Sequence, residues 1–567
     1  MATLSARAGQ ALRWGTLTLL ARIGLQLMTQ VLLARVLGPQ AYGVYAIGLT
    51  LLTFAGFLAG NGFAYGLLLR PQINEQDIRL AFTWQVSAGL VCAAAMALGA
   101  PALASFFRAP ELVPTLRWMA LACAFTAGAG TALALLQRAL DQRRQGLLQL
   151  AAYALGYLGV GLPLALAGWQ AEALAVACAT QAAATLVLAL WLRPHPLRPL
   201  WHGPGRARTM DTGGRVFLTN LVNWLAANLD RLIIGRCLQA HAVGLYALAW
   251  NLAQVPVALL VGAAQPALLA SGTQLRGQGA RGGDARGQGA STAPVAAQGP
   301  GADAAPASLS PQALRRLGGA WEMAMASACA LLPAVALCLA LLATDLVALL
   351  YGPAWQSSGP LLALMLLCLP AWTAWALATP VLWHAGQAAL EARLQLPLLA
   401  LALPLWIGAA LWADASTPSA AQSLAGSDWA SGAGTFIGVL EAGSLMPMAL
   451  LTALLLHARA WRTVRAALAC LGRPAARLVP AVWRGLLLAG ACALALQAGR
   501  GLAQGLAPWL LIPVWAESPA AHAALRLLGG GAAALIAAGG LLAWRPTLLG
   551  PQALALLRRA GAVQGRP

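Results

Sequence analysis

The chain has 567 residues, of which 60% are hydrophobic and 9% are charged. Soluble proteins carry about 25% charged residues, so this composition excludes an ordinary soluble protein and predicts a polytopic membrane protein. All 36 basic residues are arginines, and the net charge is +20. Because most of these arginines lie in short loops between apolar runs, the charge is read as a signal of membrane topology, and no nucleic-acid partner is expected.

Apolar stretches long enough to cross a bilayer, about 20 residues each, recur along the whole chain. In order they are 12–37, 42–69, 81–103, 113–138, 148–168, 174–193, 216–238, 243–270, 317–343, 358–383, 394–412, 434–456, 479–500 and 521–544. The first twelve stretches form two halves of six, which belong to the internal repeat described below, and the last two stretches follow the repeat. We therefore predict an all-α fold with about 14 transmembrane helices, arranged as two pseudo-symmetric six-helix bundles plus two C-terminal helices.

The internal repeat is clearest in one pair of segments. LLARVLGPQAYGVYAIG at 32–48 recurs without a gap as IIGRCLQAHAVGLYALA at 233–249, an offset of 201 residues. The second copy keeps the glycine and tyrosine of the first but carries Gln239 where the first has Gly38. A helix-loop-helix unit repeated at this distance predicts a chain built from two similar halves, the usual construction of secondary transporters.

The two halves differ in length. A second pair of similar segments, which start at Ser105 and Ala348, has the larger offset of 243 residues. The excess is explained by residues 272–312, which lack an apolar period and are rich in Gly, Ala, Gln and Pro. Such a composition predicts a disordered loop. The expected domains are an N-terminal bundle at 1–200, a second bundle at 201–455 that contains this insert, and helices 13 and 14 with a tail at 456–567.

The distribution of arginine predicts the orientation in the membrane. If the N-terminus and every second loop face the cytoplasm, 28 arginines lie inside and only Arg108, Arg117 and Arg500 lie outside, the other five being within helices. Cytoplasmic loops retain positive charge, so both termini and the long insert are expected in the cytoplasm.

Four segments in the same order and spacing carry a family resemblance. The repeat copies at 32–48 and 228–249, with GFAYGLLLR at 62–70 and LVALLYGPAW at 346–355, resemble the polysaccharide transporter group of the multidrug/oligosaccharidyl-lipid/polysaccharide superfamily. The similarity extends over about residues 10–400. It implies two six-helix bundles of the MATE-like kind around a central cavity, and an alternating-access cycle.

The resemblance also implies a substrate and partners. Members of this group flip lipid-linked oligosaccharides, such as O-antigen repeat units on undecaprenyl diphosphate, across the bacterial inner membrane. The implied partners are this substrate, membrane lipids, and the glycan polymerase and glycosyltransferases of the same pathway. This chain departs from the group at Asn61, where members commonly carry an acidic residue before the glycine, which argues against proton coupling at that position.

Polar residues inside the predicted spans are candidates for substrate contact, because a charge there costs at least about 2.5 kcal/mol. Arg22 carries a planar fork of donors that suits a diphosphate, and amide side chains suit sugar hydroxyls. The candidate substrate-binding residues are Arg22, Gln26, Gln30, Asn61, Asn220, Asn223, Asn251 and Gln254. For Arg22 the alternative is a packing role beside a neighbouring carbonyl or acid, and for the amides it is core hydrogen bonding.

Asp230 is a candidate site for a coupling ion, H⁺ or Na⁺, because a carboxylate inside a span can exchange a proton during a transport cycle. The alternative is a salt bridge with Arg231 or with Arg35. The sequence contains no phosphate-binding loop, no nucleophile elbow and no zinc-ligand spacing. We therefore expect a transporter and not an enzyme, with no metal site and no cofactor beyond the possible coupling ion.

Two other classes of function stay open at this point. A cation-coupled multidrug or metabolite antiporter of the same superfamily needs more intramembrane acids than basic residues. A membrane polysaccharide polymerase or ligase needs polar catalytic groups in a large outer loop. The short outer loops and the Arg22 face favour the flippase over both.

Overall fold

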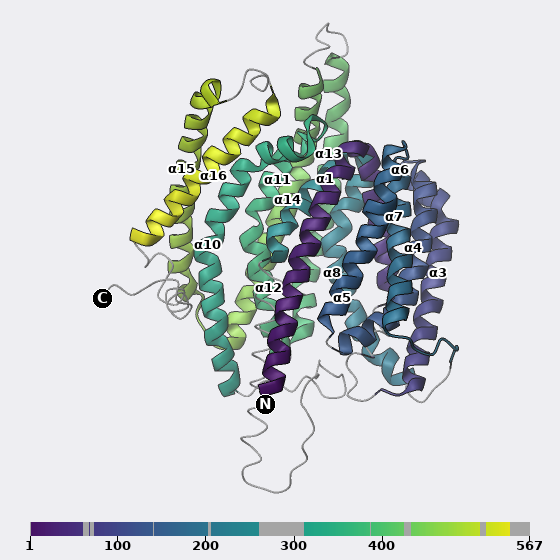
Figure 1. Cartoon of the computed structure of the whole chain (residues 1–567). Coiled ribbons are helices and arrows are strands. Elements are labelled where there is room, and N and C mark those ends of the chain that lie inside the picture. Colours follow the sequence, from purple (N-terminus) through teal and green to yellow (C-terminus); the bar gives the residue numbers. More distant parts are fainter. Residues whose placement is uncertain are drawn as a thin grey trace. The chain divides into compact units, whose positions relative to one another are not determined.

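The computed structural model describes residues 2–60, 67, 73–139, 141–201, 206–259, 311–385, 387–424, 433–510 and 518–544. Every element in these ranges is a helix (Figure 1), which confirms the predicted all-α class. Contacts within the chain define two compact units, with the division after Ala247. The domain boundaries expected at 200 and 455 stay a prediction, and the insert at 272–312 lies almost entirely outside the described residues.

The first helix, α1 (Ala2–Gly60), contains two spans. Its apolar part, Leu17–Ala59, has 43 residues, which at about 1.5 Å per residue is roughly twice the thickness of a bilayer core. The helix breaks at Gly38, where φ is 72° and ψ is 176°, and Pro39 follows. Glycine takes a positive φ without steric cost, so the chain turns here between the predicted spans 12–37 and 42–69.

Seven further elements complete most of the first unit. They are α3 (Glu75–Phe107), α4 (Leu112–Arg138), α5 (Gln142–Tyr153), the π-helix η1 (Ala154–Gly161), α6 (Leu162–Leu166), α7 (Ala171–Leu192) and α8 (Arg206–Cys237). Small residues let these helices approach closely, as is common in membranes. A Cβ added to Gly89 of α3 would overlap Ala127 of α4, and Gly128 of α4 lies against Leu186 of α7.

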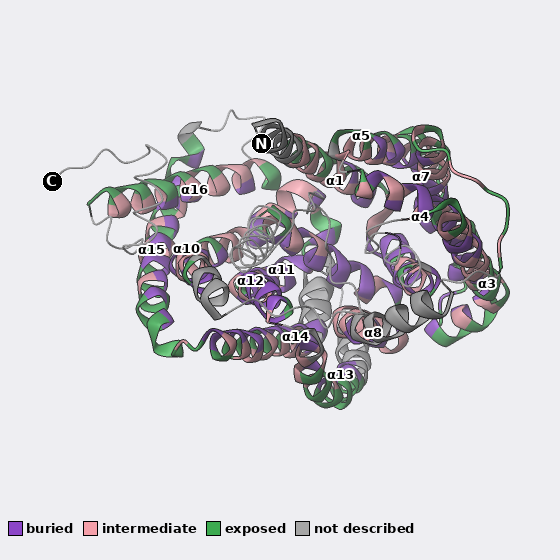
Figure 2. Ribbon diagram, turned by 90° about the horizontal axis from the view of Figure 1, so that it is seen from below, coloured by how far each residue is buried: buried purple, intermediate pink, exposed green. Residues whose placement is uncertain are grey.

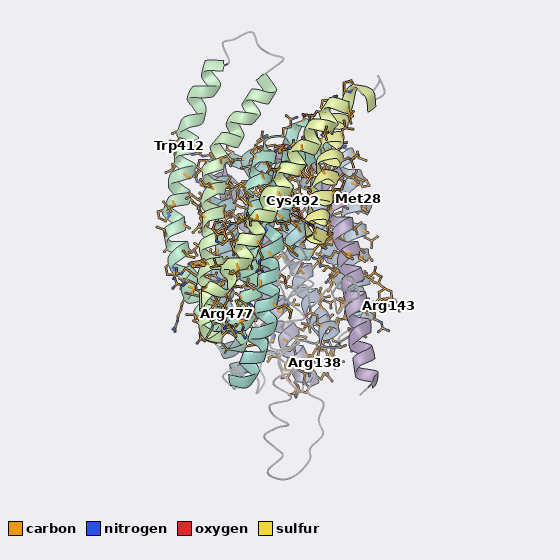
Figure 3. All side chains as sticks on the ribbon, turned by 90° about the vertical axis from the view of Figure 1, so that its left-hand side faces the viewer. Met28, Arg138, Arg143, Trp412, Arg477 and Cys492 are labelled. Atoms are coloured by element: carbon orange, nitrogen blue, oxygen red, sulfur yellow. The ribbon has the colours of Figure 1, made fainter. Side chains whose placement is uncertain are left out.

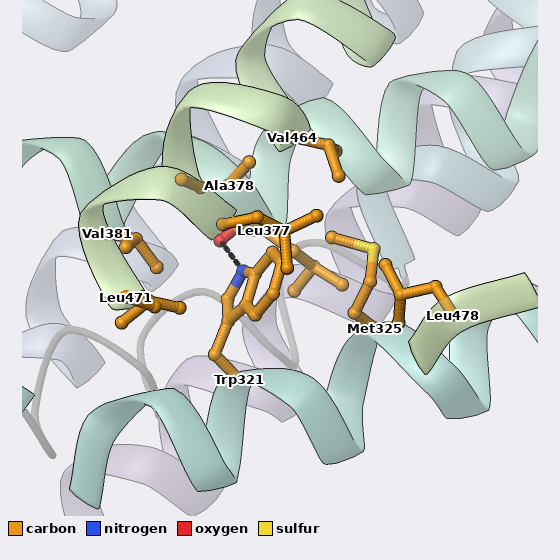
Figure 4. Close-up of a cluster of buried hydrophobic side chains, with 10 residues drawn as sticks. Trp321, Met325, Leu377, Ala378, Val381, Val464, Leu471 and Leu478 are labelled. Carbon is orange, nitrogen blue, oxygen red and sulfur yellow. Dashed lines mark hydrogen bonds between the residues drawn. The ribbon is translucent and has the colours of Figure 1, made fainter. Parts of the chain in front are cut away.

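Helix Gln239–Leu259 continues from the first unit into the second. The second unit then contains α10 (Pro311–Tyr351), η3 (Pro353–Trp355), α11 (Ser358–Leu367), α12 (Leu369–His384), α13 (Ala388–Leu424), α14 (Ala433–Leu471), η4 (Ala475–Leu478), α15 (Val479–Leu510) and α16 (Pro519–Trp544). A buried cluster of this unit surrounds Trp321 of α10, with side chains from α12, α14 and η4 (Figure 4). The Trp321 indole N–H donates to the carbonyl of Leu377 at 3.0 Å, which satisfies the only polar group of that ring.

The two C-terminal helices α15 and α16 pack through small residues. Gly499 and Ala503 on α15 lie against Gly529 and Ala533 on α16, and each glycine leaves no room for a Cβ. Leu528, Leu535 and Ile536 of α16 are 72–75% exposed, and much of this helix is coloured as exposed or intermediate in Figure 2, as expected for a helix that faces lipid. Both helices are integral parts of the second unit.

The carboxylate of Asp345 on α10 forms ion pairs with both α15 and α16. Its Oδ2 accepts from Arg500 Nη2 at 2.5 Å and its Oδ1 accepts from Arg526 Nε at 2.8 Å. Asp345 is 4% exposed. Arg500 lies on α15, which continues to Leu510, and not in a loop. The expected placement of Arg500 on the outer side stays a prediction.

Within the described residues, ten helices are long and apolar enough to cross a membrane, or 11 if the bent pair α11 and α12 forms one span. Each predicted stretch overlaps a helix, so the chain is a multi-pass membrane protein. Arg138 and Arg143 lie toward the end of the first unit where α1 begins (Figure 3), and the Arg143 guanidinium lies 4.8 Å from the centroid of the Trp14 ring. The orientation in the membrane stays a prediction from the arginine counts of the loops.

Candidate functional site

Arg22 lies on the polar face of α1 and contacts α5. Its side chain is exposed, and Nη1 donates a hydrogen bond of 2.9 Å to Oε1 of Gln149. Among the described residues no carboxylate pairs with Arg22. Gln149 is a neutral amide, so it does not neutralise the positive charge of the guanidinium. Its hydrogen bond uses only one of the five N–H donors of Arg22.

The helix face beside Arg22 continues as a row of tyrosines. Gln149, Tyr153 and Tyr157 follow one another at intervals of four residues, so they share one face of α5 and η1. The rings of Tyr153 and Tyr157 stack with centroids 4.6 Å apart, and the Tyr157 hydroxyl lies 2.6 Å from the Tyr45 hydroxyl. The Tyr42 ring centroid lies 6.3 Å from that of Tyr45. Four of the seven tyrosines in the chain are therefore gathered between α1 and α5.

Three further polar residues, at 26, 29 and 30, lie on the same side of α1 as Arg22. Gln26 and Gln30 are half-buried, and Thr29 is fully buried with its hydroxyl donating to the carbonyl of Leu25. The Nε2 atom of Gln30 is buried and has no hydrogen-bond partner among the described residues. An unpaired buried donor costs about 1–3 kcal/mol, so this amide is available to an acceptor that binds here.

Asp230 on α8 is 1% exposed. Its Oδ2 accepts from the Tyr246 hydroxyl at 2.6 Å, and its Oδ1 accepts from the backbone N–H of Arg231 at 2.8 Å. The 201-residue offset places Tyr246 on Tyr45 and Asp230 on Thr29. The two copies of the repeat therefore keep the tyrosine, but its hydroxyl is paired with a carboxylate in one copy and with Tyr157 in the other.

The two copies of the repeat touch each other through their glycines. A Cβ added to Gly43 would overlap the carbonyl oxygen of Ala240, and a Cβ added to Gly244 would overlap that of Pro39. These two contacts are related by the 201-residue offset. The residue before each carbonyl has a positive φ, 72° at Gly38 and 65° at Gln239. The positive φ is therefore kept although the residue at this position differs between the copies.

The other predicted substrate-binding residues are placed as follows. Asn223 lies half-buried on α8 next to Trp224, whose indole N–H donates to Thr53 Oγ1 at 3.4 Å. Asn251 and Gln254 are half-buried on helix Gln239–Leu259 in the second unit. Asn61 and the side chain of Asn220 lie outside the described residues.

Several polar groups of the structure were missed by the sequence analysis. Gln149, Tyr153 and Tyr157 lie in a span that was judged only by its hydropathy, although their four-residue spacing was visible in the sequence. In the second unit Glu391 is 2% exposed and accepts from the indoles of Trp375 and Trp383, each at 3.3 Å. Glu391 lies between the predicted spans 358–383 and 394–412, so the search for polar residues inside spans did not include it.

Together these features define a multi-pass helical membrane protein with an internal repeat and an uncompensated arginine on its first helix. Residues 32–281 match the model of a family described as polysaccharide biosynthesis protein. This match confirms the resemblance that was predicted from the repeat.

Two curated relatives and one solved structure are similar to the chain. It is 24% identical over 246 residues to the lipopolysaccharide biosynthesis protein WzxC of Escherichia coli K12, which covers 43% of this chain and 50% of WzxC. It is 28% identical over 156 residues to the succinoglycan biosynthesis transport protein ExoT of Rhizobium meliloti 1021, which covers 28% of this chain and 31% of ExoT. The chain thus spans half or less of the length of these relatives.

The solved structure is the lipid II flippase MurJ in an inward closed conformation. It superposes with a TM-score of 0.51 at 11% identity, covering 96% of this chain and 99% of MurJ. At this identity the likeness shows a common fold, and it extends over the two C-terminal helices as well as the bundles.

Proposed function

We propose that this protein is a flippase that moves a lipid-linked oligosaccharide or polysaccharide repeat unit, carried on undecaprenyl diphosphate, across the bacterial inner membrane. The proposal rests first on Arg22, an exposed arginine within the apolar part of α1, whose hydrogen bond among the described residues goes to an amide and not to an acid. The family match, the transport role in the name of ExoT and the flippase fold of MurJ support it.

The chemistry of the substrate suits the residues on α1. A diphosphate presents oxygens that accept paired N–H donors from a guanidinium, and such charge-assisted bonds are about twice as strong as neutral ones. Gln26 and Gln30 follow Arg22 on the same face and offer amide donors to the phosphate or to sugar hydroxyls. Asn61, Asn220, Asn223, Asn251 and Gln254 are proposed to contact the rest of the glycan.

Transport requires only a change of conformation. In alternating access the substrate binds to one state and leaves from the other, and differential affinity for the two states supplies the bias. No covalent step is involved, so we propose a transporter and not an enzyme. Both termini are proposed to face the cytoplasm, where the glycosyltransferases of the pathway would assemble the substrate and present it to the protein.

We expect Arg22→Ala to slow the flipping of a fluorescent undecaprenyl diphosphate oligosaccharide in proteoliposomes by about 10- to 100-fold. A hydrogen bond to a charged group contributes about 1.5–3 kcal/mol, and 1.4 kcal/mol is a factor of ten. Arg22→Lys should retain part of the rate, because it keeps the charge and loses the fork.

Arg117→Ala, on an exposed position of α4, is the matched control and should flip at the wild-type rate. If Arg22→Ala flips the lipid at the wild-type rate, Arg22 does not bind the substrate. If the wild-type protein moves no lipid but exports cationic drugs, the antiporter is the correct function.

We further propose that Asp230 couples transport to an H⁺ or Na⁺ gradient. An imposed gradient should accelerate flipping by the wild-type protein but not by Asp230→Asn, because the amide has a similar shape and cannot exchange a proton or carry the charge. Separate pH and Na⁺ gradients identify the ion. A variant that melts at a lower temperature in detergent yet still responds to the gradient would show that Asp230 only stabilises the contact with Tyr246.

A further inference from the structure

We propose that the face of α5 and η1 formed by Gln149 and Tyr153 binds the sugar next to the diphosphate, with Tyr157 holding the Tyr153 ring in place. This inference rests on the proposed function, because it takes Arg22 as the group that binds the diphosphate. It assigns a separate task, recognition of the glycan, to residues on another helix.

The first step of the argument is position. Gln149 contacts Arg22 directly, with 2.9 Å between Oε1 and Nη1, so it adjoins whatever Arg22 binds. Tyr153 lies four residues further along the helix, a rise of about 6 Å. A group bonded to the bound phosphate therefore extends along a face that presents first an amide and then an aromatic ring.

The second step is chemistry. A phenol ring offers an apolar face to the C–H groups of a sugar ring and a hydroxyl to its oxygens, and a primary amide both donates and accepts hydrogen bonds. Tyr153 and Gln149 are half-buried, whereas Tyr157 is buried. The first two residues are thus placed to contact a ligand, and Tyr157 is placed to support them.

The third step is preorganisation. The Tyr157 ring stacks on Tyr153 with an angle of 25° between the planes, and the Tyr157 hydroxyl is paired with that of Tyr45. A ring held by such a stack loses little conformational entropy when a ligand binds, which favours affinity.

A purely structural role explains less of what is observed. Packing of α5 on α1 would be served by leucine or alanine, and buried hydroxyls carry a desolvation cost unless they are paired. The tyrosines also lie where α5 changes to the π-helix η1. π-helical segments inside α-helices are rare and are frequently found at functional sites.

The test measures the binding of two probes to the full-length protein in nanodiscs. One probe is undecaprenyl diphosphate, and the other is undecaprenyl diphosphate that carries a single glucose. We expect the wild-type protein to bind the glucosylated probe about tenfold more tightly, on the scale of one aromatic contact with one added hydrogen bond. Tyr153→Ala should reduce that preference while leaving the affinity for undecaprenyl diphosphate unchanged. Gln149→Ala should also reduce the preference, and because it removes the hydrogen bond to Arg22 it should change the affinity for undecaprenyl diphosphate as well.

Three further variants separate the possible outcomes. Tyr153→Phe keeps the ring and should keep most of the preference for the glucosylated probe. Arg22→Ala should lower the affinity for both probes. Leu155→Ala, at a residue of η1 that is 55% exposed, should change neither affinity. Melting temperatures in detergent identify any variant that has lost its fold.

The outcomes distinguish this inference from the proposed function. If the wild-type protein binds both probes equally, or if Tyr153→Ala weakens both to the same extent, Gln149 and Tyr153 do not recognise the sugar, and the diphosphate role of Arg22 is unaffected. If the wild-type protein binds neither probe, the proposed function itself is wrong.

Discussion

Gly43→Ala and Gly244→Ala should each lower the melting temperature of the protein, whereas Gly56→Ala on the same helix α1 should raise it slightly. In a helix, alanine is normally more stable than glycine by about 0.5–1 kcal/mol. At Gly56 nothing lies within 4 Å of an added Cβ, so only this favourable effect remains.

At Gly43 and Gly244 the added methyl group would overlap a backbone carbonyl of the other repeat copy. A backbone atom cannot move aside as the end of a side chain can. The two segments must therefore separate, at a cost of about 1–3 kcal/mol or more. Because the two contacts are equivalent, both variants should lower the melting temperature by a similar amount. If this contact is kept during the transport cycle, both variants should also lower the transport rate.

Spin labels on Leu37→Cys and Leu238→Cys, which are related by the repeat offset, would measure the separation directly. In a protein whose nine native cysteines have been replaced by serine or alanine, the labels should give one short distance, and adding Gly244→Ala should lengthen it. An unchanged distance together with an unchanged melting temperature would refute the close contact.

Asp345→Ala should destabilise the second unit by about 3–5 kcal/mol, the usual cost of removing one partner from a buried ion pair. The substitution leaves Arg500 and Arg526 among apolar helices without the carboxylate that both contact. Hydrogen exchange should rise most in α15 and α16, because Asp345 is the residue of α10 that binds both.

A variant in which all three charged residues are replaced tests whether the loss of stability comes from the unpaired arginines. Replacing Asp345, Arg500 and Arg526 together by leucine or methionine removes the charges as well as the pair, and such replacements are often neutral or stabilising. The triple variant should therefore recover much of the stability lost in Asp345→Ala.

Glu111→Ala is the control, at an exposed acid immediately before α4, and it should change stability by less than about 0.5 kcal/mol. Equal stability for Asp345→Ala and Glu111→Ala would contradict the buried pair.

The fold was accessible from the sequence because hydropathy and repetition are local signals. A bilayer requires long apolar helices, and each predicted stretch overlaps a helix of the structure. The errors lie at the ends of helices, where hydropathy falls while hydrogen bonding continues. Asp345 and Arg500 were both placed at or beyond a predicted end, so the ion pair between α10 and α15 was hidden.

The site was accessible only in part, because contacts between distant helices leave no trace in one sequence. Arg22 stands out as a charge in an apolar stretch, but its partner Gln149 lies 127 residues away. The tyrosines are uncharged and were counted among the hydrophobic residues, which hid their hydroxyl pairs. The roles of the polar residues on α8 and on helix Gln239–Leu259 stay predictions.

The contact between Gly43 and Gly244 also bears on the history of the chain. After a duplication, two copies of a segment are free to diverge only where neither depends on the other. Here each copy supplies the glycine that the other copy's carbonyl approaches, so a larger residue in either one disrupts both. This mutual dependence accounts for the survival of a recognisable repeat at 32–48 and 233–249, while the flanking helices have lost most of their likeness.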